Sequence, residues 1–328
     1  MRLDFHKDHR LLFGMIFGGF VALALGIAVG PALWVNDHNP PLPGSTPLTP
    51  DQAQGLAVYV SEGCPYCHTQ QVRPLVQDRA FGRPSVPADY ARLTWLDVWR
   101  EPPAILGSER TGPDLSDVGN RQPSSMWQYM HLYEPRAVVP WSVMPAFPWL
   151  FRAEEHPEPG AVVVPVPAPY APAGRTVVLT ARAQALGAYV LALKQAPLPG
   201  AAQPSASAPP GAVSTAGASI YASRCATCHQ ANGAGLAGAF PSLVSDPVVT
   251  AADGAEHVRV VLFGRRGVPI GGVSYVSEMP AWAPQLSDDD IAAVINHERT
   301  SWGNTAPTVT PALVGTLRRQ GPGGTERP

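Results

Sequence analysis

Two short cysteine strings constrain this chain more than any other feature. Residues 64–68 read Cys-Pro-Tyr-Cys-His and residues 225–229 read Cys-Ala-Thr-Cys-His, and together they hold all 4 cysteines of the 328 residues. Each is a C-x-x-C-H string, the attachment pattern of c-type haem. Two thioether bonds would fix a porphyrin to one turn of chain, and the next residue would become the proximal iron ligand. The pattern predicts two covalently bound haem c groups, held by Cys64, Cys67 and His68 and by Cys225, Cys228 and His229.

Two other cysteine chemistries are open alternatives. A zinc site built from both pairs would use four thiolates, but it would not need a histidine directly after each pair. A thioredoxin-like dithiol would need one pair, in a βαβ setting. Haem attachment explains more of the pattern than either. Because haem c is attached outside the cytoplasm, this interpretation also places both strings outside the cytoplasm.

An apolar segment near the N-terminus predicts a membrane anchor. No charged residue occurs from Leu11 to Trp34, and a helix of this length crosses the hydrocarbon core at about 1.5 Å per residue. A cleavable signal peptide is the alternative, but its apolar region is only about 7–15 residues long. Arg2, Lys7 and Arg10 precede the segment, which places the N-terminus in the cytoplasm. We expect a single-pass protein of the bacterial inner membrane with its haems in the periplasm.

Small residues recur at every fourth position of this segment. They are Gly14, Gly18, Ala22, Gly26 and Gly30. Such spacing lets a second helix approach closely in lipid, so the stripe predicts a contact with a partner's membrane helix. Glycine is also simply common in membrane helices, and that explanation stays open.

Composition divides the rest of the chain. The 38 prolines and 31 glycines belong in loops and linkers. The net charge is -2 and no basic run occurs, which excludes a nucleic-acid partner. We predict an N-terminus and anchor at 1–36, a tether at 37–50, a first domain at 51–195, a linker at 196–213, a second domain at 214–303 and a flexible tail at 304–328. The linker holds five prolines and no charge, which is typical of an extended spacer.

The two domains look like an internal repeat. Gly-x-x-x-Tyr precedes the cysteines at residues 55–59 and again at 217–221. A Pro-x-Leu sequence follows at 113–115 and 241–243, and a Met-Pro-Ala-aromatic sequence at 144–147 and 279–282. A helical pattern closes each domain, with Thr180 and Ser287 as expected N-caps. This order resembles the class I cytochrome c domain. The resemblance implies a mostly α fold with long Pro/Gly-rich loops, a Pro-x-Leu loop on the proximal side of the haem and a late methionine as sixth ligand.

Met279 and Met144 are the predicted sixth ligands. Met279 is the second domain's one methionine, with His257 and His297 as rivals; His297 falls mid-helix beside charged residues, where a surface role is expected. In the first domain Met144 precedes Pro145, which stiffens its loop. Its rivals there are Met126, Met130, His131 and His156, and the two methionines fall in a helical pattern typical of core residues. His/Met ligation leaves the iron without an open position, which suits electron transfer.

Three longer strings resemble one particular family more closely than the general cytochrome c pattern does. They are residues 59–74 (YVSEGCPYCHTQQVRP), 110–115 (RTGPDL) and 138–145 (VVPWSVMP). With the anchor, they resemble the membrane-bound monohaem cytochrome subunit, subunit II, of cbb3-type cytochrome c oxidases over roughly residues 1–152. The resemblance implies an electron carrier beside a haem-copper catalytic subunit. Arg73 and Arg110 in these strings either pair with haem propionates or are ordinary loop arginines, and Trp141 is expected to pack on the haem.

The chain departs from that family in two places. Residues 156–176 form a Pro/Val-rich loop, and the whole second domain is additional. We expect a dihaem subunit that performs no bond chemistry itself and carries electrons from a reduced cytochrome or a quinol-oxidising complex to the oxidase. The alternatives are the cytochrome subunit of a periplasmic dehydrogenase, or a dihaem peroxidase, which would need an open iron position.

Overall fold

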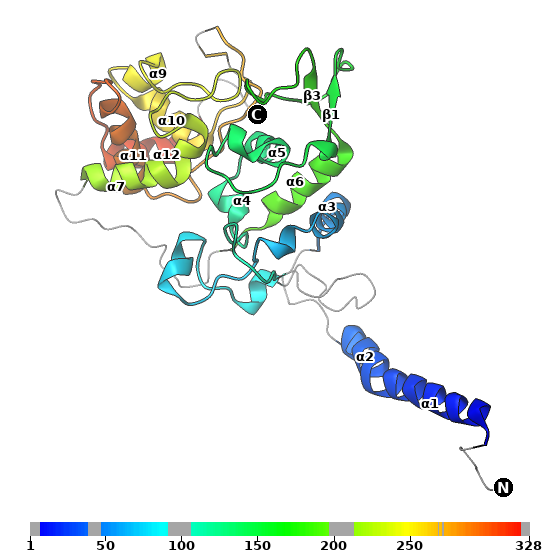
Figure 1. Ribbon diagram of the computed structural model, residues 1–328. Helices are drawn as coiled ribbons and strands as arrows, with labels where there is room; N and C mark the ends of the chain where they lie inside the picture. Colours follow the sequence, from blue (N-terminus) through cyan, green and yellow to red (C-terminus); the bar gives the residue numbers. More distant parts are fainter. Residues whose placement is uncertain are drawn as a thin grey trace. The chain divides into compact units, whose positions relative to one another are not determined.

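The computed structural model describes residues 7–38, 47–90, 106–196, 213–267, 269–270 and 272–322. Most of the expected tether and linker lies outside these ranges. The chain divides into two units, Met1–Thr49 with Val86–Ile105, and Pro50–Ser85 with Leu106–Pro328. Helices dominate the described residues, and their strands belong to one small sheet (Figure 1). The predicted mostly α fold class is therefore confirmed.

The first unit contains the N-terminal apolar helix. It runs without interruption through α1 (His9–Leu23), a π-helical segment η1 (Ala24–Val29) and α2 (Gly30–His38). The Asp8 side chain caps it by accepting from the Leu11 amide at 3.1 Å. The stretch His9–Val35 contains an 18-residue window with a mean hydropathy of 2.4 and no buried residue, so the helix is long and apolar enough to cross a membrane. This unit also contains the short turn η4 (Pro87–Tyr90).

The first domain is built around two crossing helices, α3 (Pro50–Ser61) and α6 (Ala181–Ala192). The chain between these two helices forms the shorter helices η2 (Cys64–Tyr66), η3 (Val76–Ala80), α4 (Val118–Arg121), α5 (Ser125–Tyr133), η5 (Pro135–Ala137) and η6 (Pro148–Leu150). Tyr59 and Tyr189 meet at the crossing with ring centroids 5.4 Å apart, and both are almost fully buried. Thr180 accepts from the Ala183 amide, which confirms it as the N-cap of α6.

A three-stranded antiparallel sheet frames the expected Pro/Val-rich loop at residues 156–176. Its strands are β1 (Phe151–Glu154), β2 (Val163–Val164) and β3 (Thr176–Leu179), in the order β1-β3-β2. Strand β1 precedes the loop, β2 lies within it and β3 begins at its last residue. The register pairs Phe151 with Leu179 and Val163 with Val178. Because β3 runs directly into α6, the sheet is fastened to the closing helix of the domain.

The second domain repeats the helical arrangement of the first domain. Its cysteine string follows α7 (Val213–Ile220) and the π-helical segment η7 (Tyr221–Cys225), and the string ends in α8 (Ala226–His229). After α9 (Pro247–Thr250) and α10 (Ala255–Phe263) comes the closing helix α11 (Asp288–Thr300). Ser287 and Asp290 form a reciprocal capping box, which confirms the expected N-cap.

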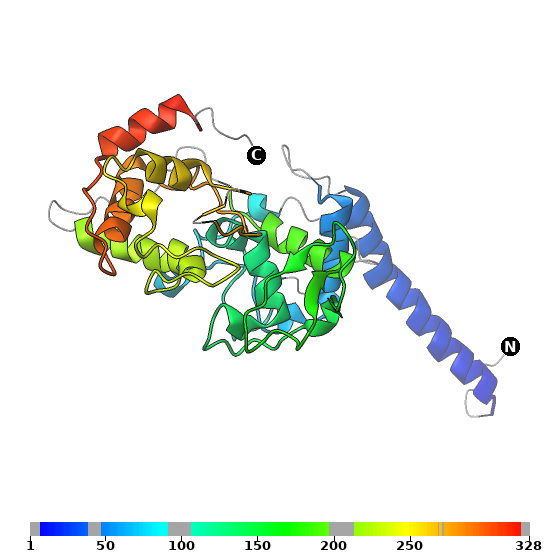
Figure 2. The same ribbon diagram turned by 90° about the horizontal axis from the view of Figure 1, so that it is seen from above.

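The expected flexible tail contains a packed helix, so that part of the prediction is wrong. Helix α12 (Pro311–Gln320) lies against α10 and α11 (Figures 1 and 2). Val314 and Leu317 are buried in the core of the second domain. Arg318 fastens the helix by donating to the Asp288 carboxylate at 2.7 Å and to two backbone carbonyls. Tertiary contacts of this kind, rather than helix propensity, hold so short a helix.

Candidate haem sites

His68 is oriented by a hydrogen bond to a distant proline. Gly63, at φ 77°, turns the chain out of α3 and into the cysteine string. The His68 Nδ1 atom then lies 2.7 Å from the Pro113 carbonyl oxygen. Because a carbonyl only accepts, Nδ1 carries the hydrogen, and Nε2 keeps the lone pair that an iron ligand needs. Burial lowers the pKa of His68, which favours this neutral form.

His229 has the same arrangement in the second domain. Its Nδ1 atom lies 2.9 Å from the Pro241 carbonyl oxygen, and burial lowers its pKa as well. Pro113 follows His68 by 45 residues, whereas Pro241 follows His229 by only 12. The two Pro-x-Leu loops therefore reach the same position beside the histidine although the connecting segments differ greatly in length.

None of the four cysteines forms a disulfide in the part of the chain that the structure describes. Burial raises the pKa of Cys64 and of Cys228 to about 12, and that of Cys225 well above its usual value. Buried neutral thiols are poor redox nucleophiles. Among the described residues, no three His, Cys, Asp or Glu side chains gather closely enough to hold a metal ion directly.

The second domain contains a cavity beside its cysteine string. Its lining includes Cys225, Cys228, His229 and Met279, and residues 122–124 of the first domain also border it. Met279 is held by a pair of backbone hydrogen bonds with Arg265, at 2.9 and 3.0 Å. The cavity therefore brings together the attachment cysteines, the proximal histidine and the predicted sixth ligand. The exposed surface of its lining is largely apolar, which suits a porphyrin, and charged side chains at its border suit the polar edge of such a group.

The two histidines that rival Met279 have other partners. His257 lines the same cavity, but its Nε2 atom lies 2.8 Å from the Glu298 carboxylate, and both side chains are only 4% exposed. His297 packs against the rings of Tyr221 and Trp302, with centroids 5.3 and 5.5 Å away, and those two rings also contact each other. His297 is therefore not the surface residue that we expected but is partly buried where α11 packs against the α7–η7 helix.

In the first domain, Met144 is the methionine that lies outside the core. Met126 and Met130 of α5 are buried, Met130 completely. Met144 is partly exposed in a loop, where its amide donates to the Ser142 hydroxyl at 3.2 Å. His156 is exposed beyond β1. Met144 therefore stays the best candidate for the sixth position in this domain.

Helix α5 supplies polar atoms that the described chain leaves without partners. Trp127 and His131 stack with ring centroids 4.6 Å apart, and neither Trp127 Nε1 nor His131 Nδ1 has a hydrogen-bond partner. Burial lowers the pKa of His131 to about 4, so the ring is neutral near pH 7. Buried polar atoms without partners are rare in folded proteins, and a bound group with acceptor oxygens would satisfy them.

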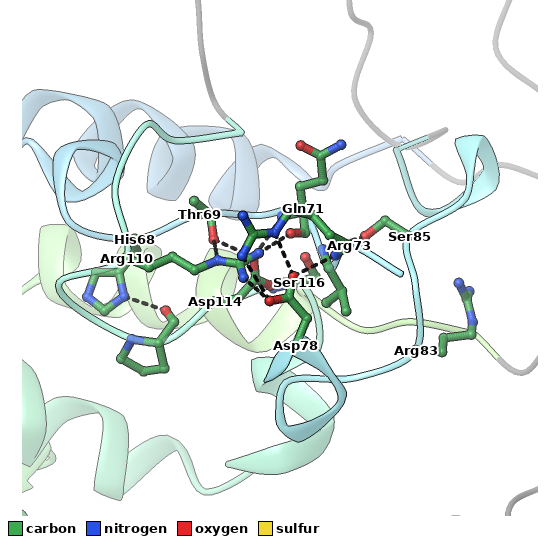
Figure 3. Close-up of polar contacts among 12 residues, drawn as sticks. His68, Thr69, Gln71, Arg73, Asp78, Arg83, Ser85, Arg110, Asp114 and Ser116 are labelled. Atoms are coloured by element: carbon green, nitrogen blue, oxygen red, sulfur yellow. Dashed lines mark hydrogen bonds and ion pairs between the residues drawn. The ribbon is translucent and has the colours of Figure 1, made fainter. Parts of the chain in front are cut away.

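Arg73 and Arg110 are both committed to one buried carboxylate. Asp78 accepts from Arg73 Nε and Nη2, each at 3.0 Å, and Arg110 Nη1 binds the same carboxylate (Figure 3). Their charges are thus already paired within the chain, and the propionate role has no support from these contacts. Trp141, which we expected to pack on the haem, has 83% of its surface exposed. No motif marks Asp78, so sequence reasoning missed it.

Comparison with known families supports both domains. Residues 6–161 match the family described as cytochrome c oxidase, mono-heme subunit/FixO, and residues 212–297 match cytochrome c oxidase, cbb3-type, subunit III. Cytochrome c-552 of Thermus thermophilus is 44% identical over 92 residues, 27% of this chain and 69% of that protein. The cbb3-type cytochrome c oxidase subunit FixP of Azorhizobium caulinodans is 35% identical over 88 residues, 26% of this chain and 27% of its own length.

Similar sequences also occur outside oxidases. The cytochrome c subunit of a quinone alcohol dehydrogenase from Gluconacetobacter polyoxogenes is 41% identical over 109 residues, which is 33% of this chain. The match spans 23% of that subunit, so less than a quarter of it is shared. The likeness therefore concerns single cytochrome domains.

Proposed function

Because the chain belongs to the cytochrome c family, we propose that it is a dihaem electron-transfer subunit that delivers electrons to a cbb3-type haem-copper oxidase. One observation carries this proposal. The family of mono-heme oxidase subunits matches the anchor together with the first domain as far as residue 161. A second cytochrome domain follows over residues 212–297. The resemblance to an anchored oxidase subunit extended by a second cytochrome domain is thereby confirmed, and such a chain carries electrons without being a catalyst by itself.

Each domain would hold one haem c. Cys64 and Cys67 would attach the first, with His68 and Met144 as its iron ligands; Cys225 and Cys228 would attach the second, with His229 and Met279. Bound haem c supplies a reversible one-electron Fe(III)/Fe(II) couple. The chain's own contribution is to hold each imidazole by a prolyl carbonyl and to close the sixth position with a thioether. A closed iron position favours electron transfer over peroxidase chemistry.

The anchor would cross the bacterial inner membrane once and place both haems in the periplasm. Its length and hydropathy suit a crossing, and the cationic residues before it suit a cytoplasmic N-terminus. The partner in the membrane would be the haem-copper catalytic subunit. The donor would be a reduced cytochrome or a quinol-oxidising complex on the periplasmic side.

A second candidate is the cytochrome subunit of a periplasmic dehydrogenase. The relatives named as cytochrome subunits of quinone alcohol dehydrogenase and gluconate 2-dehydrogenase favour it. In that case electrons would leave a substrate-oxidising subunit and pass through the same two haems. The two candidates differ in the partner and not in the haem chemistry.

Co-purification from native membranes separates the candidates. A tagged chain should retain a haem-copper subunit, and its pyridine haemochrome should give two haems c per chain. A variant truncated after Gln195 should give one haem and keep the membrane partner, because the anchor and the oxidase-like domain are intact. Recovery of a quinoprotein or flavoprotein dehydrogenase instead would favour the second candidate, and one haem in the full chain would contradict the dihaem assignment.

A further inference from the structure

Asp114 joins the two segments that meet at the first proximal histidine. Its carboxylate is fully buried. Oδ2 accepts from the Thr69 hydroxyl at 2.6 Å and from the Gln71 amide at 2.8 Å, both just after His68 (Figure 3). Oδ1 accepts from the Ser116 amide at 2.8 Å. The carboxylate thus fixes the segment after His68 to the segment that carries the Pro113 carbonyl.

Arg110 extends this connection from the other side. Its Nε donates to the Thr69 hydroxyl at 2.7 Å, and one Nη lies 3.5 Å from the Asp114 carboxylate. The other Nη binds Asp78, which Arg73 also holds. Asp114 and Arg110 therefore contact residues 69–71 directly, while Asp78 anchors Arg110, and charge-assisted hydrogen bonds of this kind are stronger than neutral ones.

The second domain lacks this cluster at the matching position. Ser242 stands where Asp114 stands in the repeat. Its hydroxyl donates to the Gly233 carbonyl at 3.3 Å and accepts from the Val244 amide at 3.1 Å. The distance from histidine to prolyl carbonyl is 2.9 Å there, against 2.7 Å in the first domain. Of the two domains described, only the first has a carboxylate at this position. It is also the domain in which the longer segment joins the histidine to the Pro-x-Leu loop.

We propose that Asp114 and Arg110 are positioning residues that set the reduction potential of the first haem by holding the Pro113 carbonyl against His68. The proposal rests on the proposed function only in taking His68 as an iron ligand. A well-placed acceptor on Nδ1 increases the basicity of the imidazole. A more basic ligand stabilises ferric iron, so loosening this contact raises the potential.

Simple electrostatics predicts a different pattern, which makes the proposal testable. Removing the negative charge of Asp114 would raise the potential, and removing the positive charge of Arg110 would lower it. Loss of positioning instead raises the potential in both cases. The sign of the Arg110→Ala effect therefore separates the two explanations.

The experiment is a spectroelectrochemical titration of the purified dihaem protein, without any oxidase, together with ferric haem-methyl NMR shifts. We expect Asp114→Ser and Arg110→Ala each to shift the ferric/ferrous equilibrium of the first haem toward ferrous iron by about tenfold, equivalent to about 59 mV for one electron. The NMR shifts of that haem should change as well, and the second haem should not respond. Asp114→Asn keeps an acceptor oxygen and should shift the potential less than Asp114→Ser.

Asp117→Asn is the matched control. Asp117 is a carboxylate of the same segment, but it accepts from Asn120 and the Gln195 amide and not from the segment after His68. It should leave the first potential unchanged. A lower potential in Arg110→Ala, or equal shifts in Asp114→Asn and Asp114→Ser, would overturn the proposal. If Asp114→Ser fails to load haem, the sign of the Arg110→Ala shift still decides. Failure to reduce an oxidase would count against the proposed function alone.

Discussion

Gly55 of α3 lies directly against the backbone of Ala185 in α6. A Cβ atom at position 55 would stand 2.0 Å from the Ala185 carbonyl oxygen. In the second domain a Cβ atom at Gly217 would stand 2.2 Å from the Ala293 carbonyl oxygen. The glycine of each Gly-x-x-x-Tyr repeat thus allows the opening helix of its domain to touch the closing helix. This crossing holds the two ends of each domain together.

Replacing Gly55 by alanine should destabilise the first domain. Alanine in an open helix position stabilises by about 0.5–1 kcal/mol relative to glycine. Here the methyl group meets backbone that cannot move aside, and overpacking typically costs about 1–3 kcal/mol. Denaturant titration should show this loss for Gly55→Ala, while Gln54→Ala on the exposed face of α3 should be neutral. A stabilised Gly55→Ala protein would mean that the helices do not cross this closely.

Exchanging Met279 for histidine should lower the potential of one haem. Imidazole stabilises ferric iron more than a thioether does, and axial ligands move potentials over about 0.8 V, so a drop on the order of 100 mV is expected. Met144→His should do the same to the other haem. Met130→Leu, a volume-conserving change in the core, should move neither potential. A redox titration in which Met279→His matched the unaltered protein would point to another sixth ligand.

The first domain should lose stability in acid through Asp78. Hydrogen bonds from Arg73 and then Arg110 hold the pKa of Asp78 well below its usual range. An acid with a depressed folded-state pKa stabilises fully above its unfolded pKa, about 3.9, and loses this contribution as the pH falls further. Denaturation at pH 7 and pH 3 should therefore show a larger loss for the unaltered protein than for Asp78→Asn. Equal losses would show that Asp78 is not linked to folding.

Breaking the pair of His257 and Glu298 should destabilise the second domain. Removing one partner of a buried hydrogen bond costs about 1–3 kcal/mol, because the other is left unsatisfied. Glu298→Leu should therefore cost far more than the combined change His257→Leu with Glu298→Leu. Chemical denaturation of the four proteins completes a double-mutant cycle. Additive effects in that cycle would rule out a direct coupling between the two side chains.

The proposed role of the stripe of small residues in the anchor can be tested by comparing Gly18, which is on the stripe, with the adjacent Gly19. A Cβ at Gly18 or Gly19 meets nothing within 4 Å in the described chain. Gly18→Leu would block close approach on the stripe, whereas Gly19→Leu adds the same bulk to another face. Co-purification of the membrane partner should fall for Gly18→Leu and stay unchanged for Gly19→Leu, with haem content equal in both. Equal recovery with both variants would favour the simple abundance of glycine in membrane helices.

Local sequence signals predicted much of this structure. The caps at Thr180 and Ser287 and the helix around Met126 follow from hydrogen bonding and spacing within a few residues. The repeat indicated which elements correspond in the two domains. The predictions that the structure confirmed therefore concerned features that span a few residues or that occur in both domains.

Contacts between distant residues were not predictable in the same way. Asp78 meets Arg110 across 32 residues, and no local pattern marks the pair. Helix α12 is short and contains Gly315, so propensity alone does not predict it. His297 falls among charged residues in the sequence, yet the helix crossing buries part of it against Tyr221. Each of these depends on tertiary packing that single-sequence spacing does not encode.

The packing of α12 has a consequence for how independently this helix can open. Amide hydrogens in a helix exchange with solvent through the smallest part of the fold that can open by itself. Arg318 and the buried Leu317 make the last helical turn part of the same cooperative unit as α10 and α11. Hydrogen exchange in α12 should therefore be about as slow as in α10 and α11.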